Sequence, residues 1–161
     1  MAYAGALCLL QTYKLAKIES DYKLMDYNNE LLEATQKSGD VNNLFSTKLA
    51  DLKGAQARAL NMKGSDDATN MTRVLEEVNG EEFSFSANNM EALEKQLEAE
   101  IDKVTAEQQQ SLAEINADEQ VWQSKVDNEQ ATNALLQTNI DNCQKMVENN
   151  IASSHTYGYN S

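Results

Sequence analysis

Proline is missing altogether from this chain of 161 residues, and glycine is scarce, at six residues. Proline lacks a backbone N–H group and clashes with the preceding helical turn, so its absence is what long, uninterrupted helices require. Aromatic residues make up only 6% of the chain. A β-sandwich normally needs more β-branched and aromatic residues and frequent turn signals. These absences predict an all-α protein.

Positive charge is also scarce, with 13 Lys and Arg residues against 26 Asp and Glu residues and a net charge of −13. The arginines, Arg58 and Arg73, are isolated. Binding to nucleic acid depends on clustered Lys and Arg residues that neutralise phosphates. We therefore expect neither a nucleic acid nor an anionic membrane surface as partner. The acidity indicates a solvated surface, with a chaperone or scaffold for a basic partner as the alternative.

No segment approaches the length of about 18 apolar residues that a membrane span requires. Residues 1–10 are apolar, but they lack a basic segment before them and continue directly into a polar-patterned helix. This pattern predicts no cleaved signal peptide. The expected location is therefore the cytoplasm, or outside the cell after export by a route that needs no signal peptide.

Residues that could carry chemistry are few. The chain has one histidine, His155, which excludes a zinc site built from several histidines. It contains no Glu-x-x-His pair of the di-iron type and no glycine-rich phosphate loop. Asp66 and Asp67 lack the remaining ligands and the glycine of a calcium loop. We therefore expect no enzyme activity, no catalytic residue, no metal site, no cofactor and no small-molecule substrate.

The chain divides into four expected segments. An N-terminal amphipathic helix covers residues 1–38, and Gly39 suits the left-handed residue that ends a helix, with Asp40 capping the next one. Residues 39–86 form an irregular helical middle, in which Phe83-Ser-Phe85 alternates like a short β-ribbon or forms an extended loop. A long C-terminal helix follows over residues 87–151, and a polar tail over residues 152–161.

The long C-terminal helix has three candidate N-cap residues, namely Ser86, Asn88 and Asn89. Its centre, residues 105–133, has only a thin apolar seam among Gln, Glu and Asn. Three arrangements could cover that seam: the middle segment, another subunit, or a fold-back of the helix near Asn116.

Apolar residues recur at alternating spacings of three and four in both terminal helices, as in the a and d positions of coiled coils. Asn29 interrupts one position of this pattern in the first helix and would fix its register at a cost in stability. We expect an elongated helical hairpin or coiled-coil-like bundle. The expected helix-packing seam consists of Cys8, Leu15, Ile18, Tyr22, Met25, Leu32, Met90, Leu97, Ile101, Val104, Trp122, Leu136, Ile140, Cys143 and Val147.

The two cysteines, Cys8 and Cys143, both lie within apolar stripes. Free cysteines in such positions behave as small buried residues, which is the expected role of both. The less favoured alternative is a disulfide between them. An antiparallel pairing of the terminal helices would bring Cys8 and Cys143 level, and a disulfide would need their Cα atoms within about 7 Å.

One comparison with known families rests on three features of the sequence. These are the apolar stripes Leu15-Ile18-Tyr22-Met25-Leu32 and Leu136-Ile140-Cys143-Val147, the amide-rich runs, and the irregular centre at residues 79–86. In layout, the chain resembles subunits exported by flagellar and type III secretion machines, such as flagellins and translocon-filament proteins. The resemblance covers the ends and the general plan, without a specific motif. It implies terminal helices that pair as a coiled coil and build a filament core or dock a chaperone.

Two functions remain open at this point. The first is a non-catalytic structural protein that assembles with protein partners, mainly with itself, as a homo-oligomer, exported filament or appendage subunit. The second is an acidic helical adaptor, scaffold or secretion chaperone that holds a client protein. Both would act by burying apolar side chains of one helix against another, at about 1.5–3 kcal/mol for each fully buried side chain.

Overall fold

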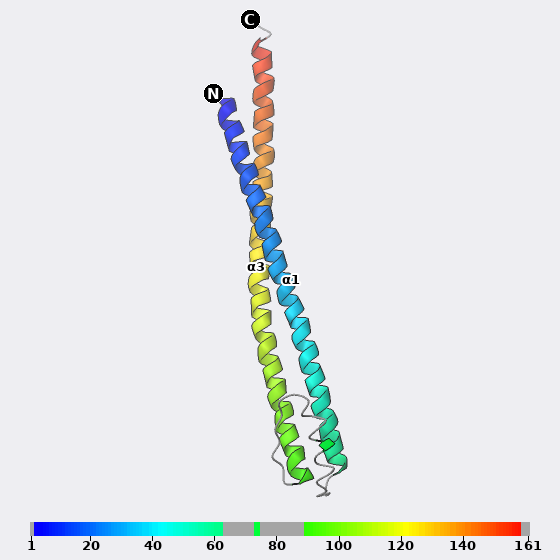
Figure 1. Cartoon of the computed structure of the whole chain (residues 1–161). Coiled ribbons are helices and arrows are strands. Elements are labelled where there is room, and N and C mark those ends of the chain that lie inside the picture. Colours follow the sequence, from blue (N-terminus) through cyan, green and yellow to red (C-terminus); the bar gives the residue numbers. More distant parts are fainter. Residues whose placement is uncertain (1, 63–72, 75–88, 159–161) are drawn as a thin grey trace. The chain divides into compact units, whose positions relative to one another are not determined.

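The computed structural model describes residues 2–62, 73–74 and 89–158. Two long helices dominate this part of the chain: α1, Ala2–Asn61, and α3, Met90–Gly158. They pack against each other as an all-α helical hairpin (Figure 1). The expected all-α hairpin is therefore confirmed. The Phe83-Ser-Phe85 segment and the Asp66-Asp67 pair lie outside the described residues.

The hairpin consists of two compact units. The first, which we call the terminal unit, contains Met1–Ala34 and Asp118–Ser161; the second, the central unit, is Thr35–Ala117. Within the terminal unit, Leu10 packs with Ile140, and Ser20 is hydrogen-bonded to Asn133. In these contacts, higher residue numbers in α1 meet lower residue numbers in α3, so the two helices are antiparallel in the terminal unit.

The expected helix break at residues 38–40 is wrong, because α1 continues through Gly39 without interruption. Glycine in a helix costs about 1 kcal/mol relative to alanine, a penalty that packing on both sides readily outweighs. Ser38 is half-buried between the buried Ala34 and the half-buried Val41, at spacings of four and three. The inward-facing pattern of α1 thus crosses the glycine without a change of register.

The start of α3 follows one of the three expected caps. The backbone N–H of Ala92 donates to the side-chain oxygen of Asn89 at 2.9 Å, and that of Leu93 donates to the Asn89 carbonyl at 3.0 Å. Asn89 is therefore the N-cap residue. Glu91 lies in the first turn, where the positive end of the helix dipole stabilises a carboxylate.

From Met90, α3 is continuous to Gly158, so the fold-back considered near Asn116 does not occur. Neither proline nor glycine interrupts this helix before its last residue. Most of the segment expected as a polar tail is helical as well. The centre of α3 contacts α1 through Trp122 with Tyr27, and also through Gln108 with Asn42 because the first helix extends further than expected. In the central unit, the second half of α1 packs on the first part of α3.

The central unit has an apolar core. Its buried residues, all 3% exposed or less, are Leu52, Ala55, Ala59, Val74, Met90, Leu93, Leu97 and Val104. Phe45, Leu49, Met62 and Ile101 pack around them. The small alanines of α1 leave room beside the larger leucines of α3, so the two helices can approach closely. Burial of apolar side chains therefore holds the two helices of this unit together.

Candidate helix–helix interface

The residues of α3 that were expected in a packing seam face α1. Met90, Leu97, Val104, Ile140 and Cys143 are buried. The half-buried members of the same set are Ile101, Trp122, Leu136 and Val147. Ile140 and Cys143 form a small core in the terminal unit with Leu10 of α1, and Tyr13 and Val147 pack against it.

The residues of α1 that were expected in the seam do not pack in the hairpin. All of them are exposed, namely Cys8, Leu15, Ile18, Tyr22, Met25 and Leu32. The prediction that these residues form the α1 side of the seam between α1 and α3 is therefore wrong. The reason is that the first part of α1 carries two apolar patterns at the same spacing, and α3 occupies the other one.

The pattern that does face α3 also alternates in steps of four and three along α1. Its buried or half-buried members in the terminal unit are Ala6, Leu10, Tyr13, Lys17, Ser20, Leu24, Tyr27, Leu31 and Ala34. Lys17 and Ser20 interrupt it, and two of its members are alanines. The sequence signal was therefore present, but it was weaker than that of the exposed pattern.

The exposed pattern forms what we call the outer stripe: Cys8, Gln11, Leu15, Ile18, Tyr22, Met25, Asn29 and Leu32. Leu15 is 67% exposed, Tyr22 64% and Leu32 56%. At about 100° per residue, the centre of this stripe lies about 150° around the helix from the seam that faces α3. The same helix therefore has one apolar face against α3 and a second, more strongly apolar face without a partner in the hairpin.

The outer stripe is limited to the terminal unit. The next positions at the same spacing are Gln36, Gly39, Asn43 and Ser46, so the apolar character ends after Leu32. On α3, the exposed large hydrophobic residues Val121, Leu135, Met146 and Ile151 lie 14, 11 and 5 positions apart, too far apart to form a continuous stripe. Single exposed apolar residues of that kind are normal, whereas a continuous apolar patch marks an interaction site.

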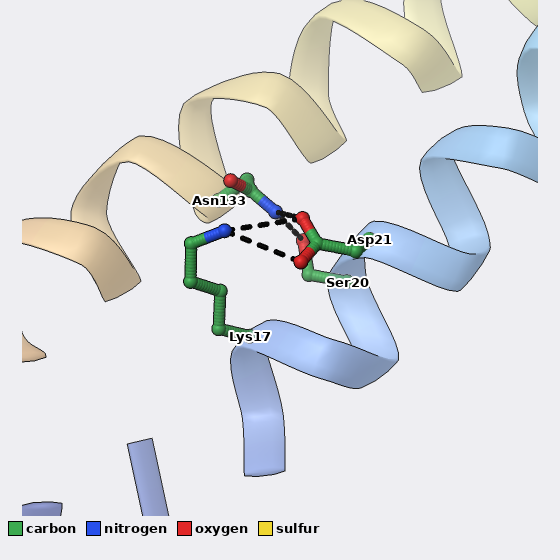
Figure 2. Close-up of polar contacts among 4 residues, drawn as sticks. All are labelled: Lys17, Ser20, Asp21 and Asn133. Carbon is green, nitrogen blue, oxygen red and sulfur yellow. Dashed lines mark hydrogen bonds and ion pairs between the residues drawn. The ribbon is translucent and has the colours of Figure 1, made fainter. Parts of the chain in front are cut away.

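A polar cluster joins the two helices in the middle of the terminal unit (Figure 2). The Asn133 side-chain amide of α3 donates to Asp21 Oδ1 at 2.6 Å and to Ser20 Oγ at 3.2 Å. Lys17 Nζ donates to both carboxylate oxygens of Asp21 at 3.2 Å. These hydrogen bonds from Asn133 and Lys17 favour the ionised carboxylate and lower the pKa of Asp21 below its ordinary value of 3.8.

An aromatic contact between α1 and α3 lies about two helical turns after Ser20 in α1. The rings of Tyr27 and Trp122 are tilted, with centroids 6.0 Å apart. Lys125 Nζ lies 3.7 Å from the centroid of the Trp122 ring, a distance suited to a cation–π interaction. The terminal unit is therefore held together by a mixture of small apolar, polar and aromatic contacts.

Both cysteines are free thiols, and they lie in different environments. Cys143 is buried in the terminal core, whereas Cys8 is exposed on the outer stripe. The alternative of a disulfide between them is therefore wrong for this structure, and so is the expectation that Cys8 is buried. The cause is the face of α1 on which Cys8 lies, which is turned away from Cys143.

Among the residues that the structure describes, the remaining side chains that could carry chemistry do not cluster into a site. Within the described ranges, no group of three or more His, Cys, Asp or Glu residues could hold a metal ion. His155 is exposed in the last turn of α3. Among the same residues, neither helix contains a stretch long and apolar enough to cross a bilayer.

Fold and surface together define a two-helix hairpin with an exposed apolar stripe on one helix. Searches against protein-family models, curated proteins and solved structures gave no significant match. The function is therefore inferred from the surface of the hairpin itself.

Proposed function

We propose that this protein is a non-catalytic assembly subunit and that it binds its protein partner through the outer stripe of α1. The observation that carries the proposal is the exposure of the stripe. Large apolar side chains recur there at coiled-coil spacing while α3 occupies the opposite face of the same helix. A regular spacing of three and four is the pattern that a second helix can cover with interlocking side chains.

The size of the surface supports this function. At accessible areas of about 200–250 Å² for a whole large residue, the exposed fractions of Leu15, Ile18, Tyr22, Met25 and Leu32 leave about 600 Å² of mainly apolar surface open. A patch of that size is as large as the largest patch on a typical monomer, about 300–600 Å², and such patches are often functional.

The flanks of the stripe suit a protein partner as well. Glu19 and Asp21 border the stripe, and each is paired within its own helix, Glu19 with Lys23 at 3.0 Å and Asp21 with Lys17 at 3.2 Å. Their charges are thereby locally balanced beside the apolar surface. Export and assembly into a filament or appendage, which the resemblance to secreted subunits implies, remain predictions.

The test compares two pairs of exposed apolar residues on α1. Leu15→Asp with Ile18→Asp places charges in the outer stripe, and the matched control, Leu44→Asp with Leu60→Asp, alters exposed leucines of α1 in the central unit. All four residues lie on the same helix, so the changes in helix propensity are alike. Solution mass is measured by light scattering behind a sizing column, and helix content by circular dichroism.

We expect the unchanged protein and the control to form a species heavier than 17.9 kDa, and the stripe variant to have the mass of a single chain with its helix content retained. Buried aspartates would have to be desolvated in the interface, which strongly disfavours association. A monomeric unchanged protein at high concentration would contradict the proposal. So would a stripe variant that associates as well as the control.

A further inference from the structure

We propose that the partner of the outer stripe is the same stripe of a second copy, and that the two helices run antiparallel about a two-fold axis level with Ser20. This inference rests on the proposed function. It goes further in naming the partner, the orientation and the register of the helices.

The choice of partner follows from the distribution of apolar surface. Among the described residues, the outer stripe is the one exposed surface on which large apolar residues recur at regular spacings of three and four. The exposed apolar residues of α3 and of the central unit are scattered. In a second copy, the surface that matches the stripe is therefore the stripe itself. An interface in which the same patch meets itself is isologous and closes as a two-fold dimer.

The outer stripe is symmetric in sequence about Ser20. Gln11 and Asn29, its two polar members, lie at equal distances from Ser20 along the sequence. The apolar members are symmetric in the same way, as the pairs Cys8 with Leu32, Leu15 with Met25, and Ile18 with Tyr22. An antiparallel dimer centred there places Gln11 opposite Asn29 of the second copy at both ends. Every apolar member then faces another apolar member.

Matched amides matter because a buried amide that faces an apolar side chain loses its hydrogen bonds to water. Gln11 and Asn29 each have donors and acceptors, so a side-chain pair of the two can satisfy both. Moving the antiparallel register by one heptad in either direction would place Asn29 opposite an apolar residue, Ile18 or Ala4. The two amides therefore select one register, as a single polar layer does in other coiled coils.

Side-chain volumes separate antiparallel from parallel pairing. A parallel dimer in register would stack Tyr22 on Tyr22 and Cys8 on Cys8, the largest residue with the largest and the smallest with the smallest. The antiparallel arrangement pairs Tyr22 with Ile18, and Cys8 with Leu32, so layer volumes are more even. It also places the dipoles of the two α1 helices in opposite directions.

The area reaches the range of small specific interfaces. Complete coverage of two stripes of about 600 Å² each would bury at most about 1,200 Å² in total, the lower limit of the usual size of specific interfaces. A dimer of this kind is reversible, and its affinity depends on how well the layers pack rather than on area alone. Because the stripe ends after Leu32, the interface is complete with two copies and does not propagate along α1.

The test uses the exposed native thiol of Cys8. Three proteins are oxidised with diamide at a concentration where the dimer forms, and then separated on a denaturing gel without reductant: the unchanged chain, Leu32→Cys, and Leu32→Cys combined with Cys8→Ala. Cys143 is left in place because a buried thiol is inert. In the antiparallel register, residue 8 of one copy faces residue 32 of the other.

We expect cross-linked dimer from Leu32→Cys alone, and at most one-tenth of that yield from the unchanged chain and from the combined variant. Cross-linking of the unchanged chain and of the combined variant would mean that position 8 meets position 8, and position 32 meets position 32. That result is the parallel dimer and overturns this inference. A dimer that depends on the stripe but gives no cross-link in any variant overturns the register. In both cases the proposed function stands, whereas a monomer in the mass measurement refutes it together with this inference.

A second measurement addresses the amide layer. Dimer dissociation constants are determined by sedimentation for Gln11→Leu, for Asn29→Leu and for the double variant. We expect each single variant to bind up to about 10-fold more weakly, and the double variant to bind at least as tightly as the unchanged chain, because the two residues contact each other across the interface. Additive effects of the two substitutions would show that they lie in separate layers, which contradicts the antiparallel pairing.

Discussion

The two units of the hairpin use α1 in opposite ways. In the central unit, Phe45, Leu49 and Leu52 of α1 lie in or against the core, where Leu52, Ala55 and Ala59 are wholly inaccessible to solvent, while Leu44 and Leu60 are exposed. In the terminal unit, Leu15, Ile18, Tyr22, Met25 and Leu32 lie exposed on the outer stripe, while the side that faces α3 carries Leu10, Leu24 and Leu31 together with alanines, Lys17 and Ser20. The terminal unit therefore leaves a regular apolar stripe exposed, and the described residues of the central unit form no such stripe.

The contacts between α1 and α3 also differ between the central unit and the terminal unit. The central unit is held mainly by burial, and a hydrogen bond of 3.3 Å from Gln108 to Asn42 joins its helices at the surface. The terminal unit adds the Asn133 cluster and the Tyr27–Trp122 contact to a small core. Polar contacts add little net stability but fix which residues lie level. Under the proposed function, the central unit stabilises the hairpin and the terminal unit carries the surface for association.

The largest effect is expected from the core of the central unit. Leu97→Ala should lower the free energy of unfolding by about 3–5 kcal/mol, because Leu97 is fully buried among close neighbours and leaves a cavity. Ile140→Ala in the terminal core should lower the free energy of unfolding by less, about 2–3 kcal/mol, since fewer buried residues surround Ile140. Urea unfolding followed by circular dichroism measures both. An equal or larger loss for Ile140→Ala would remove the distinction between the two units.

A smaller effect is expected from the aromatic contact of the terminal unit. Trp122→Ala should lower the free energy of unfolding by about 1–2 kcal/mol, because the side chain is only half-buried and its contact with Tyr27 is lost. The neighbouring Val121, which is exposed, provides the control: Val121→Ala should change stability by no more than about 0.5 kcal/mol. The same urea titration compares them, and equal effects would mean that the ring contact is not stabilising.

The smallest effect concerns the ionisation of Asp21. Because its pKa is lower in the folded than in the unfolded chain, its contribution to stability is present above pH about 4 and is lost as pH falls through the lowered pKa. Asn133→Ala should raise the pKa of Asp21 towards its ordinary value, and by more than Lys17→Met does. Carboxyl NMR shifts followed against pH measure this. A larger effect of Lys17→Met would show that the ion pair, rather than the contact between helices, controls the carboxylate.

Much of the hairpin could be predicted from the sequence. The absence of proline and the spacing of Leu97, Val104 and Ile140 predicted a long C-terminal helix, and Asn89 was among its expected caps. Whether that helix folds back near Asn116 was left open. The continuity of α1 at Gly39 could not be predicted. A glycine next to two cap-forming residues reads locally as a helix end. A contact of α1 with α3 close to this glycine, the hydrogen bond from Gln108 to Asn42, involves a residue far away in the sequence.

The interface was only half predictable for a related reason. The outer stripe was identified residue by residue, because Leu15, Ile18 and Tyr22 are larger and more apolar than the residues between them. Its assignment to the hairpin was wrong. Two patterns of the same period lie on one helix, and periodicity shows that a face is apolar without showing which neighbour covers it. Leu10, Tyr13 and Leu24 face α3 although their stripe contains a lysine and a serine.

Local backbone preferences and the helical repeat are enough to make this chain helical and to give α1 an apolar face at coiled-coil spacing. Those properties depend on residues that are close together in the sequence, so they can be predicted from the sequence. The passage of α1 through Gly39 and the turning of the outer stripe away from α3 depend instead on which surfaces meet. The contacts of Ser20 and Asp21 with Asn133 join residues more than a hundred positions apart, so they arise only when the two helices pack together.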